Sequence, residues 1–226
     1  MESTGTTPDI PIVFEDNHLL VISKPVGLLS QEDHTGEPDV LTLCKRYIKK
    51  RYDKPGNVFL GLVHRLDRPV GGVMLLAKTS KAASRLSEQI RKRTVKKRYL
   101  AVVNGQPPAN GFLEHHIIKD EKTNTVKVIK KPVKNSKPAQ LSFLKLEQSK
   151  NLALLEINLI TGRAHQIRIQ LAEAGTPIIG DQKYGKGEVK TDIALFAHSF
   201  QAEHPTLKET MIFKAVKPAG YPWDIF

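Results

Sequence analysis

The sequence predicts an α+β fold around one mostly antiparallel sheet. Short segments rich in β-branched and apolar residues recur along the 226 residues and are joined by links of hairpin length, whereas helical periodicity occurs in two places. The chain shows no internal repeat and no linker long enough to divide it. We therefore expect a disordered polar tail at residues 1–10, followed by a single domain at residues 11–226.

The first half of the chain predicts three strands and a helix. Residues 18–25 and 57–65 have the composition of strands and lie beside turn residues, and residues 71–79 predict a third strand. Thr79 or Ser80 can cap the helix that follows. Its apolar residues repeat at helical spacing, whereas its lysines and arginines point elsewhere: Ala82, Ala83, Leu86 and Ile90.

The second half predicts five strands and one helix. Residues 98–105 form a strand, and residues 139–160 form a hairpin around a polar Gln-Ser-Lys-Asn turn. A helix is predicted over residues 163–175, ending at Gly175. Two further strands are expected at residues 194–204 and 209–218.

Charge and cysteine content restrict the class of protein. With 35 Lys and Arg against 23 Asp and Glu, the formal charge of +12 favours a polyanionic partner such as nucleic acid, although a merely soluble basic protein has the same balance. The single Cys44 excludes an internal disulfide and a multi-cysteine zinc site, which fits a reducing compartment. No signal peptide or membrane span is evident, so a cytoplasmic protein is expected.

The stretch HRLDRP, residues 64–69, places one acid, Asp67, beside His64, Arg65 and Arg68 at the end of a predicted strand. Such an acid is most often a solvated turn residue, whose surface ion pairs contribute under about 1 kcal/mol. However, turn residues follow it directly, and such junctions are where rigid scaffolds present catalytic groups. Asp67 is therefore a candidate functional residue.

A second polar cluster begins the predicted helix at residues 163–175. Free backbone N–H groups and the positive end of the helix dipole suit phosphate there, although Arg and Gln are also ordinary helix formers on a solvated face. Arg168 lies mid-helix on a stripe of small residues, where a guanidinium requires an anionic partner. Asp67 is a candidate for that partner. The other members of the cluster are Arg163, His165 and Gln166.

Two basic runs, residues 91–98 and 127–137, are either solvated faces or phosphate contacts. The first contains Lys96 and Lys97 and is followed by Tyr99. An aromatic ring beside a cationic path is typical of a base-stacking site, although Tyr99 is equally consistent with a buried strand residue.

Other catalytic classes lack their motifs. His115 and His116 are adjacent and would face opposite sides of a strand, and no H-E-x-x-H pattern occurs, so metal catalysis is not expected. The sequence also lacks the G-x-S-x-G elbow of serine hydrolases and the phosphate-binding loop of NTPases.

Four segments together resemble the RluA-like family of RNA pseudouridine synthases. HRLDRPVGGVMLLAKT resembles its catalytic-aspartate motif, KKRYLAVVNG its tyrosine motif, ITGRAHQIRIQLAEAGTPIIGDQKYG its third motif, and VISKPVGLLSQ its N-terminal strand and turn. The resemblance implies a central sheet flanked by helices, with an RNA cleft across it, and neither metal nor organic cofactor. It also implies isomerisation of specific uridines in structured RNA, rRNA or tRNA, by a protein expected to be monomeric.

The same resemblance implies roles for individual residues. Asp67 is the expected catalytic aspartate, Tyr99 the active-site tyrosine and Arg168 the basic partner of Asp67. Arg65 lies where the family inserts a side chain into the space of the flipped base. Pro69 and Val70 replace a Thr-Ser pair common in the family, and we expect the protein to lack the small accessory RNA-binding domain that some relatives carry. The expected RNA-binding residues are His64, Arg65, Lys96, Lys97, Arg163, His165 and Gln166.

The alternative is a non-catalytic RNA-binding or ribosome-assembly protein on the same fold, which would need only the basic surface. A metal-dependent nuclease is a weaker third hypothesis, and activity that survives a chelator would exclude it.

Overall fold

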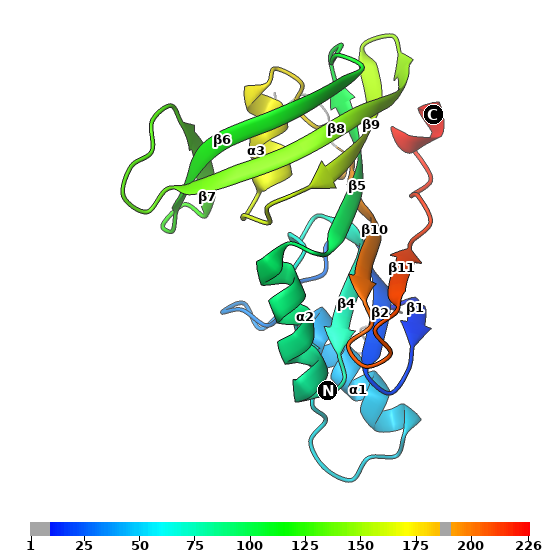
Figure 1. The fold of residues 1–226 in the computed structure, drawn as a ribbon. Coiled ribbons are helices and arrows are strands. Elements are labelled where there is room, and N and C mark those ends of the chain that lie inside the picture. The colour runs from blue at the N-terminus through cyan, green and yellow to red at the C-terminus, as the bar shows by residue number, and fades with distance from the viewer. Residues whose placement is uncertain (1–9, 186–190) are drawn as a thin grey trace.

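The computed structural model describes residues 10–185 and 191–226 (Figure 1). The predicted tail at residues 1–10 therefore lies outside the described residues, except for Ile10. The elements are β1 (Ile12–Glu15), β2 (Leu19–Lys24), α1 (Val40–Arg51), β3 (Gly61–Leu62), β4 (Gly71–Ala77), α2 (Ser80–Lys92), β5 (Lys96–Asn104), β6 (Asn110–Asp120), β7 (Thr125–Ile129), β8 (Lys137–Ser149), β9 (Leu152–Leu159), α3 (Gln166–Glu173), β10 (Leu195–Glu203), β11 (Thr210–Lys214) and the 3-10 helix η1 (Trp223–Ile225).

The strands of the described residues form one sheet in the order β1-β2-β4-β10-β5-β9-β8-β6-β7, with β3 paired to β4 and β11 paired to β10. Within it, β4 and β10 run parallel and the other neighbouring strands run antiparallel. The predicted α+β class with mostly antiparallel pairing is confirmed. Figure 1 shows α1 and α2 beside one end of the sheet and α3 beside the other end.

The parallel contact between β4 and β10 depends on a glycine. Gly72 has a φ of 115°, and a Cβ at this position would collide with the backbone of Ala197. A residue without a side chain lets the two backbones approach closely in a conformation that other residues rarely adopt. Because β10 pairs with β5 on its other edge, this contact joins the Asp67 loop that precedes β4 to the strand that carries Tyr99.

Side chains cap the starts of α1 and α2. The Asp39 carboxylate accepts from the backbone N–H of Thr42 at the start of α1, and the Thr79 hydroxyl accepts from that of Ala82 at the start of α2. Thr79 was one of the two predicted caps, and α2 ends at Arg93 in the left-handed conformation. These caps offset the unpaired N–H groups of each first turn.

Three predicted elements are clearly shorter than expected, and one of them is the strand predicted at residues 209–218, which spans Thr210–Lys214. The strand predicted at residues 57–65 forms only at Gly61–Leu62, because the following segment is held by side chains; the Ser30 hydroxyl donates to the carbonyl of Leu66 and accepts from its N–H. The helix predicted at residues 163–175 begins at Gln166, because His165 adopts a left-handed φ of 51°. Its end at Gly175, which has a φ of 79°, agrees with the prediction.

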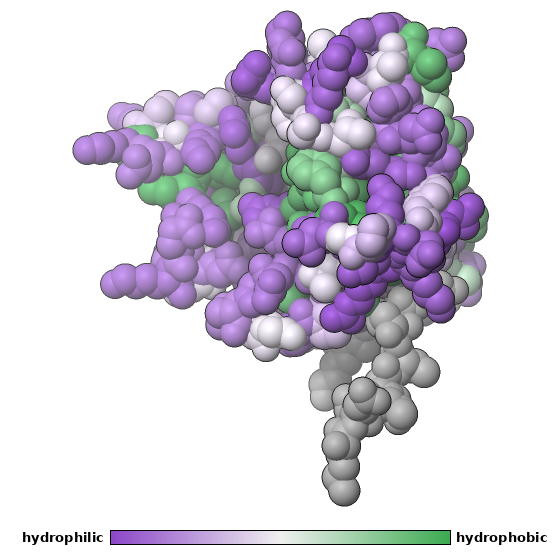
Figure 2. All heavy atoms as spheres, turned by 90° about the horizontal axis from the view of Figure 1, so that it is seen from below, coloured by the Kyte–Doolittle hydropathy of each residue, from purple (hydrophilic) through white to green (hydrophobic). Residues whose placement is uncertain are grey.

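One side of the molecular surface is hollowed. Figure 2 shows two hydrophilic projections that enclose a recess in which hydrophobic side chains are visible. The placement of an RNA cleft across the sheet stays a prediction. In the described part of the chain, no helix is both long and apolar enough to cross a membrane.

Candidate active site

Asp67 begins a tight turn that leads into β4. The N–H of Val70 donates to the carbonyl of Asp67 at 2.9 Å, and the carbonyl of Arg68 accepts from the N–H of Gly27 at 3.0 Å. The loop after β2 thus holds the turn from one side. The Arg68 side chain points outward, where its guanidinium pairs with Glu37. The Asp67 turn is therefore fixed mainly by backbone contacts, and its carboxylate is left to face Arg168.

A buried lysine adds a further brace to this turn. Lys24 is 1% exposed, and its ammonium donates to the carbonyls of Pro25, Leu28 and Arg68 at 3.0, 2.6 and 3.0 Å. Burial lowers the pKa of Lys24 to about 8, although the negative charge of Asp67 opposes the shift. Sequence reasoning missed this residue, because a lysine at the end of a strand gives no sign that its ammonium turns inward.

Arg168 links Asp67 to a second carboxylate. Its Nη1 donates to Asp67 Oδ2 at 3.3 Å, as the sequence predicted, while Nε and Nη2 donate to the two oxygens of Asp181 at 2.8 and 2.6 Å. The bidentate ion pair with Asp181 is the shorter and more buried of the two contacts, and it was not predicted from the sequence. Burial lowers the pKa of Arg168, but the Asp181 and Asp67 carboxylates outweigh burial and leave it raised.

The solvent exposure of the side chains differs sharply among Asp67, Arg168 and Asp181. The side chains of Arg168 and Asp181 are 5% and 1% exposed, whereas that of Asp67 is 27% exposed. Burial would raise the pKa of Asp181, but hydrogen bonds from Arg168 and from two backbone N–H groups lower it. Asp67 is therefore the solvent-facing end of an otherwise buried ionic network.

His165 approaches the same carboxylate from another side. Its Nε2 lies 3.9 Å from Asp67 Oδ2, and its Nδ1 lies 2.7 Å from the hydroxyl oxygen of Tyr184. Burial lowers the pKa of His165 more strongly than the Asp67 carboxylate raises it. The ring is thus mainly uncharged at neutral pH.

Tyr99 lies on β5, between β9 and β10, with a buried side chain. Burial and the Asp67 charge both raise the pKa of its phenol. Its hydroxyl forms no hydrogen bond within residues 10–185 and 191–226, so it is free to contact a bound molecule. The structure thus brings all three predicted catalytic residues, Asp67, Tyr99 and Arg168, into one electrostatically coupled group.

Comparison with known proteins identifies the family. The model of the RNA pseudouridylate synthase family matches residues 18–173. The chain is 33% identical over 219 residues to the dual-specificity RNA pseudouridine synthase RluA of Escherichia coli, covering 95% of both chains. The chain belongs to the RluA-like family of RNA pseudouridine synthases. The predicted enzyme class, an isomerase acting on RNA, is confirmed at the level of the family.

Two further similarities concern substrate and fold. The synthase is 33% identical over 213 residues to the ribosomal large subunit pseudouridine synthase C of Haemophilus influenzae, covering 90% of this chain but 64% of that protein's length. The structure of human RNA pseudouridylate synthase domain containing 4 matches with a TM-score of 0.78 at 24% identity, covering 92% of this chain and 88% of the other. The second match shows the shared fold.

Two residues expected to bind RNA form hydrogen bonds within the synthase. His64 Nε2 accepts from the N–H of Leu75 and its ring stacks on Phe200; burial and then the nearby Lys97 lower the pKa of His64 to about 3. Gln166 is 2% exposed, and its amide bonds to Thr161, Gln140 and the backbone of residue 163. His64 Nε2 and the amide of Gln166 therefore already have partners in the protein.

The remaining predicted RNA contacts divide by exposure. Arg65 and Lys96 are exposed, whereas Lys97 is half-buried and burial lowers its pKa. Arg163 donates to the carbonyl of Pro138 and retains other N–H groups. At the start of α3, the His165 side chain is thus turned toward Asp67, whereas the half-buried Arg163 stays a predicted RNA contact.

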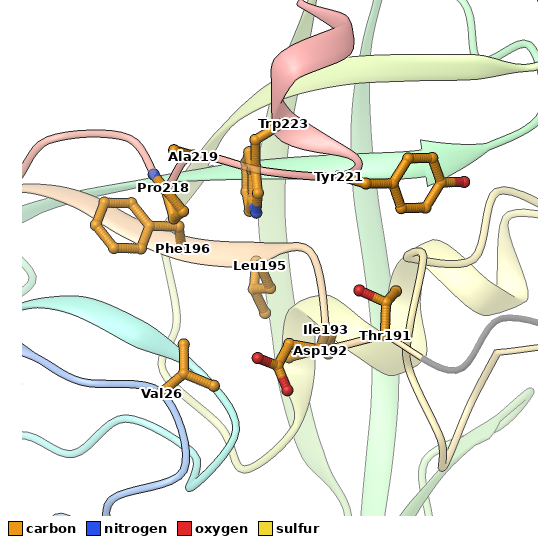
Figure 3. Close-up of a pocket in the computed structure, with 10 residues that line it drawn as sticks. All are labelled: Val26, Thr191, Asp192, Ile193, Leu195, Phe196, Pro218, Ala219, Tyr221 and Trp223. Atoms are coloured by element: carbon orange, nitrogen blue, oxygen red, sulfur yellow. The ribbon is translucent and has the colours of Figure 1, made fainter.

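A separate pocket of about 120 Å³ lies over β10 (Figure 3). Its walls include Val26, Asp192, Phe196, Tyr221 and Trp223, and the predicted catalytic residues are not part of the lining. The pocket is therefore distinct from the Asp67 group.

Among the described residues, no three His, Cys, Asp or Glu side chains are grouped as a metal site would require.

Proposed function

We propose that this synthase converts uridine to pseudouridine in large-subunit ribosomal RNA, with Asp67 as the catalytic group. One observation carries the proposal: Asp67 is the solvent-facing carboxylate of the buried Arg168–Asp181 network. A structural ion pair gains nothing from exposing one end, whereas a carboxylate that acts on a substrate must be reachable. The arrangement also supports an enzyme over a non-catalytic RNA-binding protein.

The reaction breaks the bond between N1 of uracil and C1′ of the sugar, then joins C5 of the base to C1′. The C5 proton is released and N1 gains one, so the reaction needs no redox partner and no net water. An ionised carboxylate beside C1′ can act as a nucleophile, or it can stabilise or deprotonate the sugar. In both routes the Arg168 cation holds the Asp67 carboxylate in place and stabilises its negative charge.

Tyr99 is best suited to contact the base as a neutral phenol. Because burial and Asp67 raise its pKa, the hydroxyl stays protonated at neutral pH and is a poor proton acceptor. The ring can stack on the turned base while the free hydroxyl donates a hydrogen bond. Arg65, exposed two residues before Asp67, is placed to enter the space that a flipped base leaves.

Ribosomal RNA is the favoured substrate because several of the curated relatives are ribosomal large subunit pseudouridine synthases. The charge of +12 suits any structured RNA, so transfer RNA is the competing substrate within the same proposal. We further propose that the synthase acts as a cytoplasmic monomer. Its RNA-binding residues, in this proposal, include Arg65, Lys96 and Arg163.

The test supplies two RNAs labelled with tritium at C5 of uridine: a large-subunit ribosomal RNA transcript and a mixture of transfer RNA transcripts. Release of tritium from the ribosomal transcript, with pseudouridine in the digested product, is the expected result. Release from transfer RNA alone would overturn the choice of substrate. Binding of both RNAs without release, by folded protein, would favour the non-catalytic alternative.

A further inference from the structure

The segment from Asp181 to Gly185 forms a compact turn beside the Asp67 group. Asp181 Oδ1 accepts from the N–H groups of Lys183 and Tyr184 at 2.9 and 3.1 Å, and the N–H of Gly185 donates to the Asp181 carbonyl at 2.9 Å. The carboxylate that holds Arg168 therefore also fixes the turn that carries Tyr184. Because these hydrogen bonds hold the turn at three points, the Tyr184 ring has a defined place relative to Arg168.

Tyr184 contacts both side chains that face the Asp67 carboxylate, Arg168 and His165. Its ring lies 5.3 Å from the guanidinium carbon of Arg168 and meets the His165 ring edge-on, at 5.7 Å between centroids. Its hydroxyl oxygen accepts from the N–H of Val126 on β7 at 2.8 Å and lies 2.7 Å from His165 Nδ1. The hydroxyl thus connects the β6–β7 hairpin to His165.

The two hydrogen bonds of the Tyr184 hydroxyl, to Val126 and to His165, determine which atom carries each proton. The backbone N–H of Val126 can only donate, so the Tyr184 oxygen accepts there and its own proton is available for His165 Nδ1. If Nδ1 accepts that proton, the neutral ring carries its hydrogen on Nε2, which faces Asp67 Oδ2 at 3.9 Å. The opposite tautomer would place a lone pair on Nε2 against a carboxylate, which is electrostatically unfavourable.

We propose that Tyr184 fixes His165 as the Nε2–H tautomer, so that His165 is a second donor, together with Arg168, facing Oδ2 of the Asp67 carboxylate. The inference rests on the proposed catalytic role of Asp67. Both are positioning residues: His165 acts through Asp67, and Tyr184 acts through His165. Arg168 alone makes one contact with Asp67, from Nη1 to Oδ2 at 3.3 Å, and His165 Nε2 approaches the same oxygen, so two donors hold Oδ2 in place instead of one.

The direct test is the tautomer itself. Long-range nitrogen–proton NMR spectra of protein labelled at the histidine ring nitrogens distinguish the two neutral tautomers from the charged ring, and His165→Gln assigns the signal by removing it. The Nε2–H pattern is expected in the wild-type protein, and a mixture of tautomers in Tyr184→Phe. A wild-type ring with hydrogen on Nδ1, or a charged ring at neutral pH, would overturn the proposal.

The kinetic test is a double-mutant cycle of Tyr184→Phe and His165→Gln, measured by tritium release from the ribosomal transcript. Tyr184→Phe should lower kcat about tenfold with KM changed by less than about twofold, the effect of one charge-facing hydrogen bond. The double variant should be no slower than His165→Gln alone, because the hydroxyl acts through that ring. Losses that multiply, or wild-type kcat in Tyr184→Phe, would contradict the proposal.

Two controls separate this inference from the proposed function. Tyr47→Phe removes another partly buried hydroxyl, one that donates to Glu15, and should leave kcat and KM unchanged. Asp67→Asn measures the reaction without its carboxylate. An inactive Asp67→Asn beside a fully active Tyr184→Phe would refute the positioning role alone, whereas an active Asp67→Asn would refute the catalytic site.

Discussion

Replacing Arg168 with methionine should destabilise the synthase strongly at neutral pH and less at pH 5. The substitution keeps much of the side-chain volume but removes both hydrogen bonds to Asp181 and the one to Asp67. Asp181, with 1% of its side chain exposed, would then be a buried charge without its cation. Breaking a buried pair in this way costs about 3–5 kcal/mol of the free energy of unfolding.

The pH dependence follows from Asp181. In the wild-type protein its pKa is lowered, so its stabilising contribution is present above the unfolded-state pKa and is lost only as the pH falls through the lower folded-state value. In Arg168→Met, burial without the guanidinium would raise the pKa of Asp181 instead. The folded variant then gains a proton as the pH falls, which relieves the buried charge and makes the deficit smaller at pH 5 than at pH 7.

Urea unfolding of wild type and variant at pH 5, 6, 7 and 8 measures this difference. Arg68→Met is the matched control, because it breaks an exposed pair with Glu37 and should cost under about 1 kcal/mol at each pH. A deficit in Arg168→Met that is the same at every pH, or no larger than that of Arg68→Met, would refute the reasoning about Asp181.

Two further predictions concern the sheet and the RNA surface. In thermal or urea unfolding, Gly72→Ala should lower the free energy of unfolding by about 3 kcal/mol or more, because its Cβ would meet the Ala197 backbone. Gly27→Ala, which has open space around it, should lower that free energy by about 1–2 kcal/mol. Equal losses in the two variants would contradict the close approach of the Gly72 and Ala197 backbones. Lys96→Glu should weaken RNA binding and flatten the dependence of the binding constant on salt, whereas Lys50→Glu on α1 should leave the slope unchanged in fluorescence titrations. An unaltered slope for Lys96→Glu would make that residue part of a solvated face.

The sequence predicted the strands with a clear apolar pattern and missed elements that lack one. β2, β4, β5 and β9 lie within the sheet and contain runs of buried apolar residues, which composition reveals. α1 was missed because lysine and arginine crowd its sequence, although Asp39 offers a cap signal. β6 and β7 were missed because half-exposed strands carry polar and charged residues that resemble loops.

The sequence predicted the part of the site where a charged side chain needs a partner of opposite charge. A mid-helix arginine demanded an anion, and Asp67 was correctly named as one partner of Arg168. Asp181 was missed because nothing local distinguishes a two-pronged buried carboxylate from an ordinary turn acid. Polar residues such as His64 were assigned outward because their bonds to distant backbone groups depend on tertiary contacts.

The most direct test of the account is tritium release by Asp67→Asn from ribosomal RNA labelled at C5 of uridine. The substitution keeps the shape of the side chain and removes the charge that both chemical routes require. We predict a folded variant, by circular dichroism and urea unfolding, that still binds RNA and releases no tritium above background. A folded Asp67→Asn that releases tritium at the wild-type rate would contradict the assignment of Asp67 as the catalytic group.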